Sequence, residues 1–578
     1  MKQESNEKKT ALEYWRGLYE AALLADAERI DSMERNMRQY LGTDEIDGSD
    51  ERALTVRNIT YEIVESQVDP DVPLPKADAA LYSEKRDKNA RTVERLCASV
   101  RDLLPFEAMN DVDERYTYVY GASIWYVEWD GASADGISIQ CLSPLDFIGQ
   151  PGIYEIENMD YCFLRFTTTR SELSRKYGVP DEMLSLAAYE YSYGAEGADG
   201  DTVTLVVGFY KQDGEVGKIV FSGDLLISDT PFYYARKLYF CAECGEPLSA
   251  CRCQHPRKYS TNLLYEQAEL PESKQTVTLP YYLPKDFPII IRRNTAPIAS
   301  LYGLSDCERI RPQQQAINKV ESRILQKLLR AGVTPVMPED ASVSMSNSVF
   351  GQVIKLRPGE SADSYGTIDT TPDVSQDIAE ADRLYDQAKR VLGISDALQG
   401  TDDPIAESGY ARQLKISRAE GRLETKRRMK YHCYSELYKT VFRLYLAFAD
   451  EPRSLTCRDE LGRICNHEFR RADFIEPDGR GGFVYDDGYL FSVDISGGDE
   501  YGREALWERN LNNLKSGTLG DPTDPTTLLR YWRLQERAHY PYAGENTEFF
   551  EALVKSKEKE NENEENEIRH GEGAEGGR

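Results

Sequence analysis

The amino-acid sequence predicts an α+β protein with more than one domain, on three observations. Short segments in which apolar and polar residues alternate, as in strands, concentrate in residues 122–240. Segments with apolar residues at helical spacing lie on both sides of them. The stretch from about residue 405 to residue 448 contains no proline, and a continuous helix of that length would measure about 65 Å at about 1.5 Å per residue.

The first third of the chain is expected to pass from helices into strands. Residues 12–41 are predicted to form a helical arm, because Ile30, Met33, Met37 and Leu41 share one helical face. Residues 78–121 are expected to be mostly helical. Strands are then predicted at 123–129, 137–141, 161–167 and 202–210, with a short helix at 171–177.

The middle of the chain is predicted to contain two helices around a small strand-and-turn segment. Ser305 and Glu308 have the spacing of a capping box that opens the first helix. A helix resumes behind Ser375 and ends at Gly393. Between them, Pro, Gly and Ser surround one strand-like run at 349–356, whose unpaired backbone groups are expected to pair with a neighbouring chain. We also expect these two helices and the long helix to lack a compact core of their own.

The last part of the chain returns to strands and then to helices. Strands are predicted at 483–485 and 489–495, and helices at 503–514 and 528–537. From residue 555 onward the chain consists of Glu, Asn, Lys and Gly with almost no apolar residues. Such a segment cannot bury enough apolar surface to become ordered.

The composition narrows the functional classes. The 578 residues include 70 Lys and Arg against 99 Asp and Glu, a net charge of −29. This balance argues against a protein that coats nucleic acid, which needs a basic surface. The first residues are polar and no apolar run approaches the roughly 20 residues that span a bilayer, so neither a signal peptide nor a membrane contact is expected. Eleven scattered cysteines fit a reducing cytoplasm.

One cysteine cluster has the form of a metal site. Cys241 and Cys244 are followed by Cys251 and Cys253, with His255 two residues further on. Four thiolates can hold one structural zinc ion, although His255 could replace Cys253 as the fourth ligand. Because the second pair is closer than usual, four reduced thiols without metal remain the alternative. The other seven cysteines are predicted to be core or surface thiols: Cys97, Cys141, Cys162, Cys307, Cys433, Cys457 and Cys465.

The long helix is predicted to carry a basic stripe. Lys415, Arg418, Arg422 and Lys426 follow one another at i, i+3, i+7 and i+11, and Arg427, Arg428 and Lys430 extend them. Contact with phosphates is one interpretation. We favour a solvated or intersubunit face that pairs with carboxylates of a neighbouring copy.

The sequence contains no recognisable catalytic motif. It has no G-x-x-x-x-G-K-[ST], H-E-x-x-H or G-x-S-x-G, and its five histidines are widely separated. We therefore expect a protein that is not an enzyme.

The order of these segments resembles the bacteriophage portal protein, the head–tail connector. The similarity covers roughly residues 50–540 and is carried by motifs in a fixed order: Arg57-Asn58-Ile59 through Glu65–Val68 and Pro73–Pro75, YVYGASIWYVEWD at 118–130, CLSPLDFIGQPG at 141–152, LGISD at 392–396 and ESG at 407–409. The helix, strand-and-turn segment, helix, loop and long helix of residues 304–450 complete the resemblance.

The resemblance implies a division of the chain into portal regions. These are an N-terminal arm and wing over 1–300 with a zinc-ribbon-like insertion at 238–258, a stem helix at 301–331, a clip at 332–375, a second stem helix at 376–394, a tunnel loop at 395–407, a long spine helix at 408–450, wing strands at 451–500, crown helices at 501–545 and a disordered acidic tail at 546–578. Asp402 and Asp403 would lie in the tunnel loop and line the DNA channel.

The resemblance also implies partners and a location. Twelve copies would form a ring at one vertex of the capsid in the virion, after assembly in the host cytoplasm with capsid and scaffold proteins. Double-stranded DNA would enter through the ring, driven by a separate terminase, and leave through tail adaptor proteins. Another oligomeric virion protein, from a tail or an adaptor, is the alternative. A zinc-dependent nuclease is a weaker one, because an all-cysteine cluster leaves no open metal position.

Overall fold

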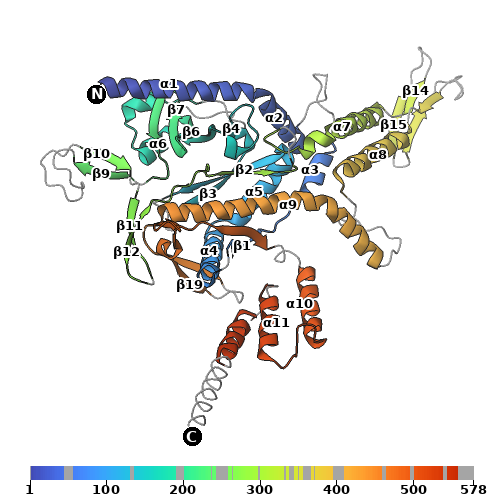
Figure 1. The fold of residues 1–578 in the computed structure, drawn as a ribbon. Coiled ribbons are helices and arrows are strands. Elements are labelled where there is room, and N and C mark those ends of the chain that lie inside the picture. Colours follow the sequence, from blue (N-terminus) through green and yellow to red (C-terminus); the bar gives the residue numbers. More distant parts are fainter. Residues whose placement is uncertain are drawn as a thin grey trace, which may run out of the picture.

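The computed structural model describes most of the chain (Figure 1). The described residues are 2–43, 56–81, 83–130, 136–189, 201–235, 237–241, 258–262, 265–271, 273–296, 300–330, 333–336, 344–348, 351–355, 366–369, 372–394, 409–458, 464–494, 500–537, 540 and 543–556. They form a mixed α+β structure of helices and several small antiparallel sheets, which confirms the predicted fold class at this level. None of the helices in these ranges is long and apolar enough to cross a membrane.

The largest sheet has five strands and is covered by the first helix. Its order is β4 (Phe147–Gly149), β5 (Tyr161–Thr169), β6 (Thr202–Gln212), β7 (Glu215–Ser222) and β8 (Leu225–Thr230), all antiparallel. Helix α1 (Lys2–Ala25) runs along this sheet (Figure 1), and its Tyr19 ring meets Phe163 edge-on at 5.5 Å. Helix α2 (Ala27–Leu41) continues the arm, as predicted, and α6 (Arg170–Tyr177) follows β5.

A second sheet lies at the centre of the molecule. Its order is β13 (Ile289–Arg293), β2 (Ala122–Trp129) and β3 (Ile137–Leu142). Helices α4 (Glu84–Leu103), α5 (Phe106–Tyr120) and the carboxyl-terminal half of α9 (Gly409–Phe448) contribute to the same apolar core as this sheet. The long predicted helix therefore exists as one element, and its amino-terminal part turns away from the body of the protein (Figure 1).

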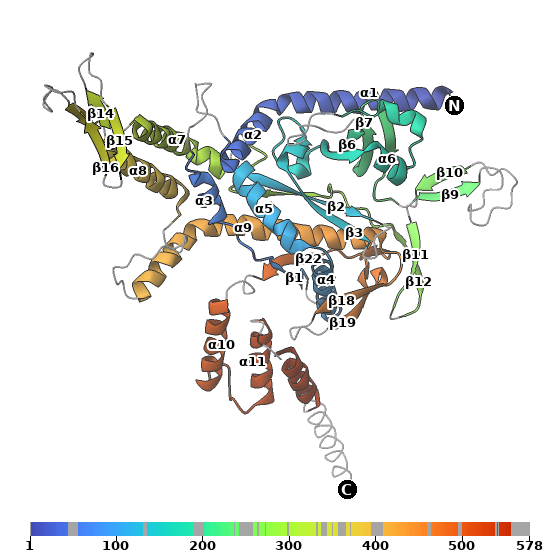
Figure 2. The same cartoon turned by 180° about the vertical axis from the view of Figure 1, so that it is seen from behind.

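Helices α7 (Asp306–Arg330) and α8 (Ser375–Leu392) lie side by side and project from the body (Figure 2). Ser305 begins α7, since its Oγ accepts a hydrogen bond from the Glu308 amide at 3.3 Å. Gly393 ends α8 in the left-handed conformation, at φ 79°. The expectation that these helices lack a core was wrong: their facing residues form an apolar cluster that includes Ile59 and Ile63 of α3 (Ile59–Glu65).

Two pairs of strands lie beyond the ends of α7 and α8 (Figure 2). β14 (Val333–Val336) pairs with β17 (Gly366–Asp369). β15 (Ser344–Ser348) pairs with β16 (Gly351–Lys355), which overlaps the predicted run at 349–356. This run is therefore not an isolated strand, as we had expected, because a hairpin within the same chain satisfies one of its edges.

Of the remaining elements, the strands at 483–485 and 489–494 and the helices at 500–515 and 525–537 match predicted segments, whereas the others were not predicted as individual segments. Small hairpins and strand pairs surround the core: β1 (Leu74–Ala79) with β22 (Tyr489–Asp494), β9 (Lys237–Cys241) with β10 (Lys258–Asn262), β11 (Tyr265–Glu269) with β12 (Thr276–Pro280), β18 (Arg453–Arg458) with β19 (Ile464–Phe469), and β20 (Ile475–Pro477) with β21 (Phe483–Tyr485). Helices α10 (Glu500–Lys515) and α11 (Pro525–Arg537) come last, followed by a helical segment at 543–556. The predicted disordered tail at 546–578 was therefore wrong for residues 546–556, which still contain apolar residues such as Phe549 and Leu553. The acidic segment 557–578 lies outside the described residues.

Candidate functional site at the long helix

The predicted site residues lie mostly outside the described part of the chain. Asp402 and Asp403 fall in the segment 395–408, and Cys244, Cys251, Cys253 and His255 fall in the segment 242–257; the structure describes neither segment. Cys241 is described: it ends β9, and its partner in the ladder is Lys258 of β10. Among the described residues no group of three or more metal-ligating side chains occurs.

The basic stripe on α9 has the predicted exposed position only in part: Arg427 and Arg428 are exposed, whereas Lys426 and Lys430 are not. Lys426 and Lys430 are buried, at 7% and 1% exposure, and both pair with carboxylates of the same chain. The neighbouring Arg428 is exposed and pairs with Glu424 one helical turn away, at 2.6 Å. The side chains of the earlier members of the stripe, up to residue 422, lie outside the described residues. Lys426 and Lys430 therefore lie inside the protein, where each belongs to a cluster of buried polar contacts that holds α9 in place. We call these two clusters anchors.

The first anchor joins α9 to the beginning of α7. The Lys426 ammonium group donates to the Asp306 carboxylate and to Gln67 Oε1, the latter at 2.8 Å. Asp306 is fully buried and also accepts from the side-chain amides of Asn294, at 3.0 Å, and Gln67, at 3.2 Å. Since four segments of the chain meet at one carboxylate, this contact fixes where the projecting helices leave the body.

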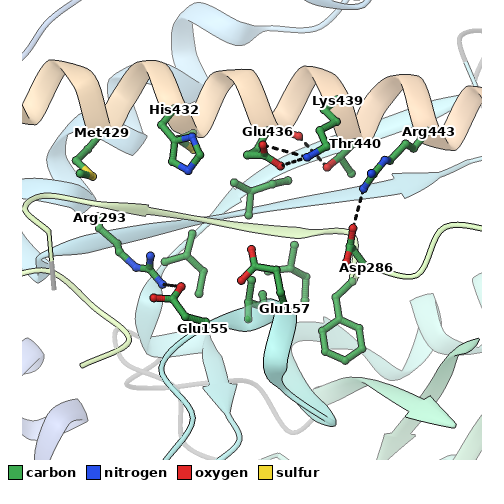
Figure 3. A pocket seen from close by; sticks show the side chains of 16 residues that line it. Glu155, Glu157, Asp286, Arg293, Met429, His432, Glu436, Lys439, Thr440 and Arg443 are labelled. Carbon is green, nitrogen blue, oxygen red and sulfur yellow. Dashed lines mark hydrogen bonds and ion pairs between the residues drawn. The ribbon is translucent and has the colours of Figure 1, made fainter. Parts of the chain in front are cut away.

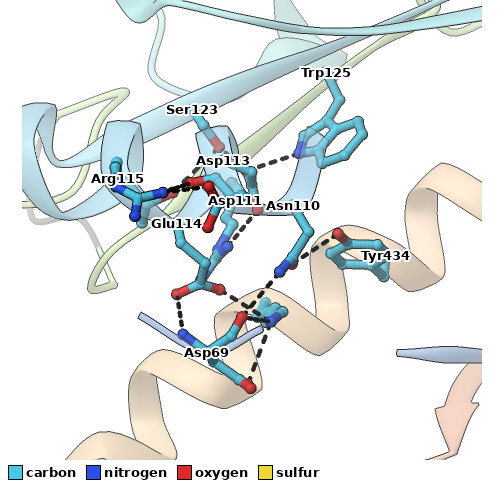
Figure 4. A network of polar contacts seen from close by, with 12 residues as sticks. Asp69, Asn110, Asp111, Asp113, Glu114, Arg115, Ser123, Trp125 and Tyr434 are labelled. Atoms are coloured by element: carbon cyan, nitrogen blue, oxygen red, sulfur yellow. Dashed lines mark hydrogen bonds and ion pairs between the residues drawn. The ribbon is translucent and has the colours of Figure 1, made fainter. Parts of the chain in front are cut away.

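The second anchor lies under the central sheet (Figure 4). Arg292 of β13 pairs with Asp113 and, at 2.8 Å, with Glu114, two neighbouring residues of α5. Lys430 of α9 reaches the same Glu114 at 3.0 Å and the Asp69 carboxylate at 3.3 Å.

Further donors complete this anchor. Trp125 Nε1 donates to Asp113 at 2.8 Å, and the Ser123 hydroxyl group also donates to Asp113. The Tyr434 hydroxyl group on α9 donates to Asn110 at 3.0 Å (Figure 4). Helix α9 is thus held to α5 and to the central sheet through directional polar contacts.

In the second anchor, Glu114 and Arg292 keep their charges despite burial. Burial by itself raises the pKa of Glu114, but Arg292 and Lys430 outweigh this effect and hold the pKa below its ordinary value. Burial likewise disfavours the Arg292 cation, yet Asp113 and Glu114 raise its pKa well above the usual range. Removing one partner would leave an uncompensated charge in a region of low dielectric constant, which costs about 3–5 kcal/mol in such pairs.

A groove of about 280 Å³ lies between α9, β13 and the turn at 155–157 (Figure 3). Its floor is apolar and its rim carries three ion pairs. Arg293 pairs with Glu155 at 3.0 Å, Lys439 with Glu436 at 3.0 Å, and Arg443 with Asp286 at 2.7 Å. The basic groups on the rim are therefore occupied by carboxylates of the same chain.

The groove residues do not provide an activated nucleophile. Cys433 is buried, and burial raises the pKa of its thiol well above the ordinary value, so it stays protonated at neutral pH. The Thr440 hydroxyl group donates to the Glu436 carbonyl oxygen at 2.8 Å, within the helix. This groove can accommodate a ligand, but these lining residues do not supply a reactive group.

One signal in the sequence could have indicated the buried anchors. Asp113 and Glu114 are adjacent acids in an otherwise largely core-facing helix, and Arg292 follows the apolar run Ile289–Ile291. Charged residues in such positions must pair when they are buried. Their partners could not be read from the sequence, because 179 residues separate Asp113 from Arg292.

Comparison of the chain with models of known protein families gives no match, and comparison with curated proteins gives none either.

Proposed function

We propose that this chain is the subunit of a phage portal: a ring at one capsid vertex through which DNA enters and leaves. The observation that supports it best is the arrangement of α7 and α8. They are packed side by side, carry two small strand pairs beyond their ends, and connect through residues 393–408 to a long helix anchored in a mixed α/β body (Figure 1). A subunit of this form can place its projecting helices around a common axis.

The charge of the chain fits a conduit. With a net charge of −29, its surface repels phosphates on average. Asp402 and Asp403 belong to the connection between α8 and α9, and in the proposed ring they line the channel. Carboxylates there keep DNA sliding, since tight phosphate contacts would hold a moving duplex. Changing both residues to lysine is expected to shorten the packaged DNA, with an effect that weakens as salt rises.

In this proposal the strands beyond α7 and α8 form the docking surface. They project from the body, so terminase can bind them during packaging and tail adaptors can bind them afterwards. The body would contact the capsid and scaffold proteins. Deleting residues 340–370 is expected to abolish packaging while the rest of the subunit keeps its core. Normal titres of such a mutant would contradict this assignment.

The decisive experiment is to determine the oligomeric state and shape of the purified protein. A ring of about twelve chains of 65.7 kDa would have a mass of about 790 kDa. Light scattering at micromolar concentration should report this mass, and negative-stain images should show rings with a central hole. A stable monomer in all salt conditions would rule out the portal. A closed oligomer without a hole would favour another virion structural protein.

We also propose a structural zinc ion in the insertion at 238–258. Cys241, Cys244, Cys251 and Cys253 are the proposed ligands, with His255 as the alternative to Cys253. The pairing of Cys241 with Lys258 brings the two ends of the cysteine segment together, as a compact metal loop requires. Elemental analysis of protein purified without added metal should find about one zinc per chain. Well-folded protein without zinc would mean that the thiols are free.

A further inference from the structure

Cys457 and Cys465 occupy directly opposite positions in a two-stranded antiparallel ladder. β18 pairs with β19 along its whole length, from the Arg453–Phe469 pair to the Arg458–Ile464 pair. In that register the partner of Cys457 is Cys465. The sequence separation of eight residues had given no reason to pair them.

The core fixes this register. Leu455 and Phe469 are 2% and 0% exposed and belong to the main apolar core. Positions two residues apart along a strand share a face, so 457 lies on the face of Leu455 and 465 on the face of Phe469. A slip of one strand by one residue would turn the apolar side chain of that strand away from the core. The register that places the two cysteines opposite each other is therefore the one that the core requires.

The spacing of opposite residues suits a disulfide. In an antiparallel ladder their Cα atoms are about 4.5 or 5.5 Å apart, and a disulfide needs about 4.4–6.8 Å. In the adjacent pair, the Thr456 hydroxyl group reaches Asn466 Oδ1 at 3.3 Å, so side chains do meet across this hairpin.

We propose that Cys457 and Cys465 form an intrachain disulfide when the protein meets an oxidising environment. Two thiols would lose two protons and two electrons, and a small disulfide such as oxidised glutathione would accept them and become two thiols. The reaction passes through a mixed disulfide: one thiolate displaces the first glutathione, and the second cysteine displaces the other. The link then joins the two strands near the turn end of the hairpin, one position before the Arg458–Ile464 pair.

Five other cysteines lie in the core or pack against it. Burial raises the pKa of the thiol in each of them, so these thiols react slowly: Cys97, Cys141, Cys162, Cys307 and Cys433. The biological timing rests on the proposed function, because a virion protein is assembled in the reducing cytoplasm and is later released to the oxidising outside. The link itself does not depend on that function.

The test uses the full chain, purified with reductant and then incubated with oxidised glutathione. Remaining thiols are blocked, and trypsin cuts after Arg458 and Arg463, between the two cysteines. Mass spectrometry should find peptide 454–458 linked to peptide 464–470 in most chains, and reduction should separate them. Cys457→Ser should abolish the linked pair, and the matched variant Cys141→Ser should keep it. Absence of the linked pair in the parent would overturn the proposal.

A shifted cysteine tests whether the register is the cause. In a Cys465→Ser background, Asn466→Cys moves the thiol by one position, to the other face of the ladder. The yield of the corresponding link should fall by about tenfold, because the geometry no longer suits a disulfide. An unchanged yield would show that the hairpin opens freely, and so would contradict the proposal.

Mixing labelled and unlabelled protein distinguishes links within one chain from links between copies. Linked pairs of mixed label would overturn the intrachain assignment. If the purified chain forms the link but makes no rings, the proposed function fails and the disulfide stands. If rings form without the linked pair, the disulfide proposal fails and the proposed function stands.

Discussion

The projecting pair of helices α7 and α8 and the attachment of α9 to the body are stabilised by different interactions. Along the projecting pair, α7 and α8 meet through an apolar seam that contains Ile310, Ile317 and Ala388. At the body, α9 is held by buried ion pairs centred on Asp306 and Glu114. An apolar seam tolerates small sliding, because the hydrophobic effect is non-directional. Buried charges accept only one geometry, since any misplacement leaves a charge without its partner.

The two regions therefore have different structural roles. The anchors set the angle at which the projecting helices leave the body, and the seam keeps the two helices together along their length. In the proposed ring, the first property would determine the diameter of the channel. The second would allow the projecting part to adjust to its partners.

The largest expected effect comes from breaking an anchor. Arg292→Met removes the cation that Asp113 and Glu114 share, and should lower the free energy of unfolding by about 3–5 kcal/mol. Urea unfolding followed by tryptophan fluorescence suits this measurement, because Trp125 donates to Asp113 at 2.8 Å. The matched control is Arg428→Met on the surface of α9, with an expected change below about 1 kcal/mol. Similar losses in both variants would mean that burial does not distinguish the pairs.

A smaller effect should appear in the acid range. Because the pKa of Glu114 is lowered in the folded protein, its stabilisation is complete above the ordinary glutamate value of about 4.3 and is lost as the pH falls through the folded value. We therefore expect Glu114→Gln to be less stable than the parent at pH 7. The difference between the two should shrink below about pH 4. A constant difference would show that Glu114 is not the titrating group.

The smallest expected effect is in the seam. Ile317 is fully buried, and Ile317→Val should lower the free energy of unfolding by about 1 kcal/mol through the lost methylene group and the cavity it leaves. Ile378 on α8 is 49% exposed, so Ile378→Val is the matched control with little expected change. A loss at Ile317 as large as that of Arg292→Met would remove the predicted difference between the two regions.

The sequence by itself determined the local elements. Helical spacing predicted the arm, the two projecting helices and the long helix, and alternation predicted the main strands, because both patterns act over a few residues. Ser305 and Gly393 marked helix ends correctly, since capping depends on chemistry within one turn. The cysteine cluster and the acidic loop at Asp402 and Asp403 remain predictions from sequence.

Only the tertiary structure decided which charges are internal. Lys426 and Lys430 look like members of a surface stripe in the sequence, and their burial follows from Asp306, Glu114 and Asp69. Likewise, the pairing of Cys457 with Cys465 depends on a register that Leu455 and Phe469 impose through the core. A sequence pattern reports the period of one element, whereas ion pairs and registers depend on which distant elements meet, and that is settled by packing of the whole core.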